Sequence, residues 1–346
     1  MIRRTIPALL AALALAAAAR AETVYFVSKT NGALYTFDTT AGGIAPLTGT
    51  NTFPNATALA MGPDGNLYVG DATDGGSIRR YVLSSGSVAT VASLTGAGPA
   101  VPGGPVNPGA IAFTPGGDML VGRNPEVAFF TGGTAAWPRG PVLSMTGWRA
   151  GESPSISAFT TGTAQDYSPG LAVAADGRLF ASNSVYSTET LQMTGDVFGF
   201  DASGTFQSAV ATGNPPAGLF GPAGLALVGN SLFTASTMNG SIFKTDLLTG
   251  TTTFFTMTPV DPVTFYPDFI GPLAATTDGS LLAGSVDANQ GFIYLFDGSG
   301  GLVTTFAGEE YGQIGGIVAV PEPSAAWLAI GGVASLGLWS LRRRRA

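Results

Sequence analysis

The chain of 346 residues contains neither cysteine nor histidine. Without cysteine it can form no disulfide, no thiolate metal site and no thiol nucleophile. Without histidine it has no imidazole base, no Ser-His-Asp triad and no zinc site of the usual kind. The sequence indicates no particular cofactor. A bound metal ion would need oxygen ligands, which leaves Ca²⁺ or Mg²⁺ as the candidate metals.

Charged residues are also scarce, at 11% of the chain, and they are unevenly placed. Seven of the 15 lysines and arginines lie at the two ends, so residues 22–341 carry eight basic and 22 acidic side chains, a formal charge of −14. An acidic body argues against nucleic acid or an anionic lipid surface as its partner. Hydrophobic residues make up 45% of the chain, which is ample for a folded core.

The N-terminus has the pattern of a secretory signal peptide. Two arginines precede an apolar run over residues 6–19, and Ala19 and Ala21 supply the small side chains of an A-x-A cleavage site. A buried core helix is the structural alternative, but the basic residues in front and the small ones behind favour a signal. We expect signal peptidase to cut after Ala21, which makes residues 1–21 the signal peptide and Glu22 the first residue of the exported chain.

The C-terminus combines a proline-rich tripeptide, an uncharged stretch and a basic cluster. Residues 324–341 contain no charged side chain, and 18 helical residues span about 27 Å, close to the thickness of a bilayer's hydrocarbon core. The flanking motifs are Pro321-Glu322-Pro323 before this stretch and Arg342, Arg343, Arg344 and Arg345 after it. We therefore expect residues 321–346 to contain a hydrophobic transmembrane helix, with the arginines cytoplasmic and the body outside.

This order of Pro-Glu-Pro, apolar helix and terminal arginines resembles the PEP-CTERM sorting signal of Gram-negative bacteria. The resemblance covers residues 320–346 and implies that a membrane-embedded exosortase recognises and cuts the tail. The body would then be released, or retained in the cell envelope or at the cell surface. A plain membrane anchor would explain the helix and the arginines but not the Pro-Glu-Pro, and an uncut tail would make the protein a membrane-retained sensor.

Between these terminal segments, in residues 22–320, one pattern recurs five times: a short apolar strand, a tight turn and a second apolar strand. The strand pairs are 58–61 with 67–69, 110–113 with 119–121, 171–173 with 179–181, 225–227 with 232–234, and 273–275 with 281–283. Turn dipeptides such as Asp-Gly and Gly-Asn permit positive φ, so each copy is predicted to be a β-hairpin. Successive turns are 49 to 60 residues apart, a spacing that suits a propeller blade of four strands.

The two ends of the repeat predict how the ring closes. Residues 23–27 and 33–38 have the pattern of second and third strands, so the first blade lacks its first strand. Residues 315–320 have the glycine-plus-apolar opening that is missing there. This predicts an all-β, six-bladed β-propeller closed by pairing of the N- and C-terminal strands, whereas a β-sandwich or an open solenoid does not account for the displaced strand.

The body resembles six-bladed propellers of the NHL, virginiamycin-lyase and gluconolactonase type, through the rhythm of an apolar strand, Pro63-Asp64-Gly65 and Leu67-Tyr68-Val69. This repeated pattern implies a fold and says little of activity. A virginiamycin-lyase activity would demand a catalytic histidine, which is absent. A gluconolactonase activity would demand a divalent metal in the channel; Asp71, Asn183 and Asp287 are an imaginable oxygen set, although that family's motifs do not match residue by residue.

The loops that follow the second strand of each blade are the places where a propeller most often meets a ligand. From them and from the swollen segment 129–148 of the third repeat, the candidate ligand-binding residues are Asp71, Arg123, Trp137, Asn183 and Asp287. Segment 129–148 is favoured because aromatic rings stack on sugars or anchor protein partners. The structural alternative is that each aspartate bonds to its own turn and that the aromatic segment packs beneath the loop.

The sequence therefore predicts a non-enzymatic, exported binding or scaffold module at the cell surface or in the extracellular matrix. Signal peptidase and an exosortase would be its processing partners, and a surface polysaccharide or a protein its ligand. Nucleic acid is not an expected partner, and membrane contact is expected through the C-terminal helix before processing. The alternative is a divalent-metal-dependent lactonase or hydrolase of the gluconolactonase type.

Overall fold

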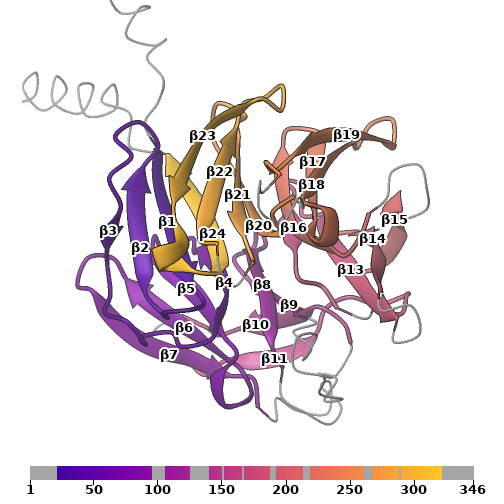
Figure 1. Cartoon of the computed structure of the whole chain (residues 1–346). Helices are drawn as coiled ribbons and strands as arrows, with labels where there is room; N and C mark the ends of the chain where they lie inside the picture. Colours follow the sequence, from indigo (N-terminus) through magenta and orange to yellow (C-terminus); the bar gives the residue numbers. More distant parts are fainter. Residues whose placement is uncertain are drawn as a thin grey trace, which may run out of the picture.

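The computed structural model describes residues 22–95, 106–124, 140–149, 152–165, 167–187, 192–212, 219–260, 267–287 and 290–321. Within these ranges the chain forms six four-stranded antiparallel sheets, which surround a central axis as the blades of a propeller (Figure 1). The predicted all-β, six-bladed architecture is confirmed. The predicted signal peptide and C-terminal helix lie outside the described residues.

The strands of each blade follow one another outward from an inner strand at the axis. Blade 1 comprises β24 (Ile314–Pro321), β1 (Glu22–Ser28), β2 (Leu34–Asp38) and β3 (Ala45–Pro46), and blade 2 comprises β4 (Ala56–Met61), β5 (Leu67–Asp71), β6 (Ser77–Val82) and β7 (Ser87–Ser93). Blade 3 comprises β8 (Pro108–Phe113), β9 (Met119–Arg123), β10 (Leu143–Thr146) and β11 (Ser155–Ala158), and blade 4 comprises β12 (Leu171–Val173), β13 (Leu179–Ser187), β14 (Gln192–Phe200) and β15 (Phe206–Thr212). Blade 5 comprises β16 (Pro222–Val228), β17 (Ser231–Ser236), β18 (Ser241–Asp246) and β19 (Thr251–Met257), and blade 6 comprises β20 (Ile270–Ala275), β21 (Leu281–Ser285), β22 (Phe292–Phe296) and β23 (Leu302–Ala307).

Short 3₁₀ helices add the remaining regular structure of the described residues. They are η1 (Thr73–Gly75), η2 (Thr237–Asn239) and η3 (Glu309–Tyr311). Over the part of the chain that is described, no helix has the length and apolar character needed to cross a bilayer.

The ring closes as the displaced strand predicts. β1 pairs with β2 on one side and with β24 on the other, and Glu22 lies opposite Pro321 at the end of that ladder. In Figure 1 the yellow C-terminal strand β24 accordingly lies beside the indigo strands of the N-terminus. β24 extends to Pro321, so the first residue of the predicted sorting segment is part of the closing blade.

Six apolar clusters hold the blades together, one at each interface between neighbours. For example, Val24 and Phe26 of blade 1 pack with Leu282 and Ile293 of blade 6, which completes the circle. Each blade must bury both faces of its sheet, and the second strands β5, β9 and β21 are buried along their whole length. This is why the first four residues of each are apolar or glycine, whereas the outer strand β19 is largely exposed.

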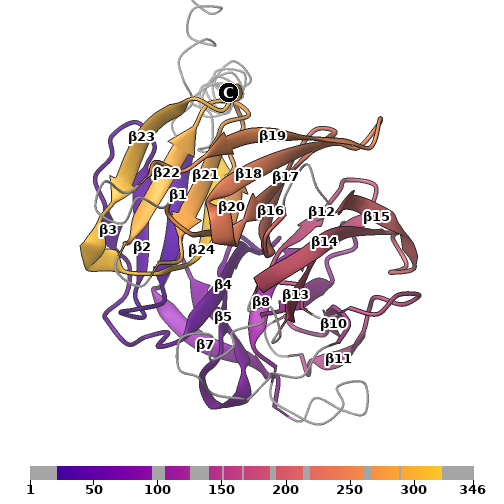
Figure 2. The same cartoon turned by 45° about the vertical axis from the view of Figure 1, so that its right-hand side comes forward.

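The inner strands lie toward the middle of the molecule in both views (Figure 1 and Figure 2) and run in the same direction. The start of each approaches the start of the next: a Cβ on Gly170, just before β12, would lie 1.9 Å from the carbonyl oxygen of Ala223, and one on Gly224 would lie 2.2 Å from that of Gly271. Because a side chain would collide with the neighbouring backbone, the glycines that open these strands follow from close packing around the axis.

This common direction gives the propeller two unlike faces. We call the face where inner strands end and turn tightly into second strands the turn face. The opposite face, where second strands end and inner strands begin, is the loop face. The chain enters blade 1 at Glu22 and leaves it at Pro321 on the turn face, since both occupy the position of a tight turn between first and second strands.

Of the segment 129–148, the structure describes residues 140–148, and these contain a strand and a buried tryptophan. Residues 143–146 form β10, and Trp148 is 2% exposed in the core between blades 2 and 3. Its ring meets those of Tyr68 and Phe113 at 5.1 and 5.2 Å, and its Nε1 donates to the carbonyl of Gly117 at 3.0 Å. Packing, the structural alternative for this segment, therefore accounts for Trp148, while Trp137 lies outside the described residues.

Candidate ligand-binding site on the loop face

The four described candidate residues all lie toward the loop face, in four different blades. Asp71 ends β5, Arg123 ends β9, Asn183 lies within β13, and Asp287 follows β21. Their spread around the ring does not create a cluster of acids: among the described residues no three acidic side chains gather where they could hold a metal ion. The oxygen set of Asp71, Asn183 and Asp287 stays a prediction; its three residues lie in blades 2, 4 and 6.

Asp71 is 2% exposed and is bonded on both of its carboxylate oxygens. Oδ1 accepts from the backbone N of Thr73 at 2.9 Å and from its Oγ1 at 2.6 Å, and Oδ2 lies 3.4 Å from Nη1 of Arg79. The first pair of bonds is the local turn interaction that the structural alternative predicts. The contact with Arg79 is a tertiary one, and it fixes a cation at the loop face.

Arg79 is the functional candidate that the sequence reasoning missed. It lies on β6 on the same face of the sheet as Asp71, because Asp71 pairs with Ser77 and Arg79 is two residues further along. Its Nη1 also donates to the carbonyl of Thr52, and its guanidinium carbon lies 4.9 Å from the ring centre of Phe53. The available signal was the adjacent pair Arg79-Arg80, the one such basic pair between residues 22 and 341.

These groups line a polar pocket on blade 2, which we call the blade-2 pocket. It has a volume of about 270 Å³ and is lined by Pro54, Asp71, Thr73, Asp74, Gly76, Ser77, Arg79, Thr90 and Ser93. Asp74 stands in it with a left-handed backbone (φ 54°), and Thr90 and Ser93 are exposed on the outer strand β7. The pocket therefore combines one cation, two carboxylates and several hydroxyl groups.

Arg123 and Asn183 are less accessible than the sequence suggested. Arg123 is 1% exposed, and its Nε donates to the carbonyl of Pro141 at 3.2 Å, while burial lowers the pKa of its guanidinium. Asn183 is 5% exposed within the β13 ladder. Both therefore offer a ligand much less surface than Asp74, Thr90 and Ser93 of the blade-2 pocket, which are exposed.

A second buried carboxylate lies at the start of blade 6. Asp268 is 3% exposed, and it accepts hydrogen bonds from Oγ of Ser285 at 3.0 Å and from the hydroxyl of Tyr294 at 2.9 Å. Burial raises the pKa of Asp268 to about 6; these two bonds oppose the rise, and the charge of Asp287 adds to it. This carboxyl group therefore titrates close to neutrality.

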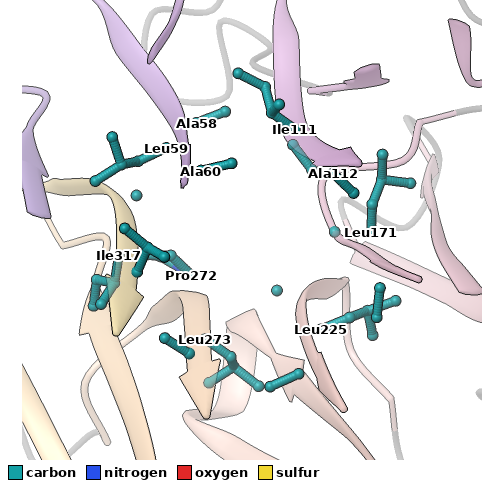
Figure 3. A pocket seen from close by; sticks show the side chains of 18 of the residues that line it. Ala58, Leu59, Ala60, Ile111, Ala112, Leu171, Leu225, Pro272, Leu273 and Ile317 are labelled. Atoms are coloured by element: carbon teal, nitrogen blue, oxygen red, sulfur yellow. The ribbon is translucent and has the colours of Figure 1, made fainter. Parts of the chain in front are cut away.

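The central channel has a different character from the rim. Figure 3 shows its labelled side chains, among them Leu59, Ile111 and Leu273, as carbon only. Its cavity of about 440 Å³ is lined by glycine and apolar residues of the inner strands alone. Each inner strand pairs with one strand only, so backbone N–H and C=O groups on its other edge supply the polar lining. Asp71, Arg123, Asn183 and Asp287 do not line this cavity.

Fold and faces together define the class: a closed six-bladed β-propeller with a channel lined by glycine and apolar side chains and with a polar rim. No protein-family model matches this sequence, and no curated protein matches it either. Solved structures are similar to it in fold at low identity. A chain of a nidogen/laminin complex is 13% identical with a TM-score of 0.60, over 86% of this chain and 98% of that one.

Two bacterial structures are similar as well. TolB from Acinetobacter baumannii is 13% identical with a TM-score of 0.57, over 88% of this chain and 67% of that one. XC5397 from Xanthomonas campestris, described as a gluconolactonase, is 14% identical with a TM-score of 0.52, over 75% of this chain and 77% of that one. At such identities these likenesses establish the propeller fold alone.

Proposed function

We propose that this protein is an exported binding module of the Gram-negative cell surface or extracellular matrix, sorted by its PEP-CTERM-like tail, and that it binds a polysaccharide. The observation that carries the binding role is the blade-2 pocket, where Asp71 and the carbonyl of Thr52 hold the guanidinium of Arg79 in place. A preorganised donor of this kind binds a ligand without first having to be ordered.

The chemistry of the pocket suits a neutral, hydroxyl-rich ligand. Nη1 of Arg79 donates to the carbonyl of Thr52 and to Oδ2 of Asp71. Among the described residues, Nε and Nη2 of Arg79 donate to no acceptor, so their N–H groups are available for ligand oxygens. Asp74, Thr90 and Ser93 supply acceptors and further hydroxyl donors. Sugar hydroxyl groups both donate and accept, so they match this mixture, whereas the acidic body disfavours a polyanion.

The binding role is tested with the purified exported protein and the neutral polysaccharide fraction of its host, by calorimetry. Arg79→Ala should weaken binding about tenfold or more, since a charge-assisted hydrogen bond contributes about 1.5–3 kcal/mol. Arg178→Ala is the matched control, because Arg178 pairs with Asp176 on the turn face, whereas the pocket lies at the loop face. Equal affinity of wild type and Arg79→Ala would show that the ligand does not use this pocket.

The sorting role is tested by the intact mass of the protein from fractionated cells. We expect loss of residues 1–21 and of the segment after about Pro323. An intact arginine tail would instead make the protein a membrane-anchored propeller.

The lactonase alternative is separated from the binding role by assaying lactone hydrolysis with Ca²⁺ or Mg²⁺ present and after chelation. Turnover that chelation abolishes would replace the binding proposal with metal-dependent catalysis. Polysaccharide binding that survives chelation, without turnover, supports the binding module.

A further inference from the structure

We propose that, before the tail is cut, the propeller is held with its turn face toward the membrane and its loop face, with the blade-2 pocket, directed outward. This inference rests on the proposed export and sorting. Its structural basis is the position of Glu22 and Pro321, the first and last residues of the propeller, which lie opposite each other in one blade.

The propeller has one point where the chain enters and leaves it. Glu22 and Pro321 are cross-strand partners, so the chain enters and leaves the propeller side by side. Oε1 of Glu22 accepts from the backbone N of Thr277 at 2.5 Å, and its carbonyl accepts from N of Thr39 at 3.1 Å. The exit is therefore fixed between a tight turn of blade 6 and a turn of blade 1, both on the turn face.

The tether between the propeller and the uncharged stretch is short. The closing strand ends at Pro321, and the uncharged stretch begins at Ser324, so two residues, Glu322 and Pro323, separate the two. Residues 322–324 reach at most about 10 Å even when extended. The six-residue inner strand β4 makes the disc about 20 Å deep. A tether of half that depth cannot let the disc turn its loop face to the bilayer.

The turn face carries negative charge around the exit. Asp38, Asp278 and Asp297 lie in turns around the exit, and a hydroxyl group of its own turn bonds each carboxylate. Those bonds are the main reason why the pKa of each lies below its ordinary value, so all three remain anionic at neutral pH. Anionic lipid therefore repels this face, and the tether rather than adhesion sets the orientation.

The absence of cysteine allows a direct test with single labels on residues 22–346, the form of the chain expected before the tail is cut. Ala41→Cys places a label on the turn face, in the exposed turn beside Glu22, and Met238→Cys places one on η2 at the loop face, where the native side chain is 39% exposed. Each variant is labelled with a fluorophore and reconstituted into vesicles of phosphatidylethanolamine and phosphatidylglycerol that carry a headgroup spin label. We expect the label at position 41 to be quenched at least twofold more than the label at position 238.

Flotation of the vesicles is measured in parallel and separates the two proposals. If the protein does not float, the uncut tail does not hold it at the membrane, and the proposed sorting role is wrong. If it floats and both labels are quenched equally, or the label at position 238 more, the proposed orientation is wrong while anchoring stands.

A lengthened tether tests the mechanism. Twenty Gly/Ser residues inserted between Pro323 and Ser324 have a mean reach of about 25 Å, more than the depth of the disc. The difference in quenching should then fall toward zero. A difference that survives the insertion would show that the turn face adheres to lipid by itself, which overturns the tether account.

Discussion

Aspartate has three different roles in this protein, and the surroundings of each carboxylate decide which one it has. Asp297 accepts from the backbone N of Ser299 and Gly301 and stays at the surface as a turn residue. Asp71 makes the same kind of local bond but also fixes Arg79 in the blade-2 pocket. Asp268 is buried beneath the loop face, where two hydroxyl groups bond it and no cation is within salt-bridge distance among the described residues.

The raised pKa of Asp268 predicts a pH-dependent stability. A carboxyl group with a pKa of about 6 in the folded state and about 4 when unfolded binds more protons folded than unfolded between these values. Its contribution is fully present below pH 4 and is lost as the pH rises through 6, by roughly 3 kcal/mol at most. Asp268→Asn should abolish this loss, so its free energy of unfolding should fall less than that of the wild type between pH 4.5 and 7.

Denaturant titrations at the two pH values measure this difference. Asp297→Asn is the control, because the lowered pKa of Asp297 keeps its titration below this window. Parallel pH profiles for Asp268→Asn and the wild type would show that Asp268 titrates at an ordinary pH.

At the level of the strand, the glycines at the starts of the inner strands are determined by the neighbouring blade. Gly170 has no positive φ, so its own backbone could accommodate alanine. What prevents a side chain there is the carbonyl of Ala223, which a Cβ would approach to 1.9 Å. Gly43 differs, since a Cβ at that position would meet no atom within 4 Å.

Gly170→Ala should therefore lower the free energy of unfolding by about 1–3 kcal/mol, the usual cost of overpacking. Gly43→Ala should be neutral or slightly stabilising, because alanine reduces the entropy of the unfolded chain. Chemical denaturation of both variants decides the point: equal effects would mean that the strands around the axis can separate at no cost.

The same packing explains why Trp148, at the end of the predicted contact segment, is part of the core. The apolar faces of blades 2 and 3 meet at an interface that needs a large side chain, and Trp148 fills it beside Tyr68 and Phe113. An aromatic residue in a long insertion is thus as much a packing element as a binding one.

For the molecule as a whole, the pairing of β1 with β24 is the interaction that closes the ring. β24 and β1 complete blade 1, and the cluster between blades 1 and 6 depends on both strands. Every other blade is continuous in sequence, so closure is the step that turns six hairpin-based sheets into a ring.

A circular permutant tests this closure. A turn of about four residues can join Pro321 to Glu22, because the two are cross-strand partners. New ends between Gly229 and Asn230 fall in a tight turn where a Cβ on Gly229 would meet nothing. We expect the permutant to fold with a melting temperature within about 10 °C of the unpermuted body, whereas removal of residues 314–321 should prevent cooperative folding. A permutant that does not fold, with a truncated chain that does, would contradict closure through β24.

The sequence by itself determined the number of blades, the position of each hairpin and the displaced first strand, because apolar periodicity and tight turns are local and repeat along the chain. The export and sorting signals that we propose for the termini also rest on the order of residue types and not on the fold. Only the tertiary structure decided that Asp71 fixes Arg79, that Trp148 is buried, that the inner-strand glycines face a neighbouring backbone, and that Glu22 and Pro321 leave the propeller together. The physical reason is the same in each case: these contacts join groups from different strands or blades, and their distance and burial are set by how the sheets pack around the axis.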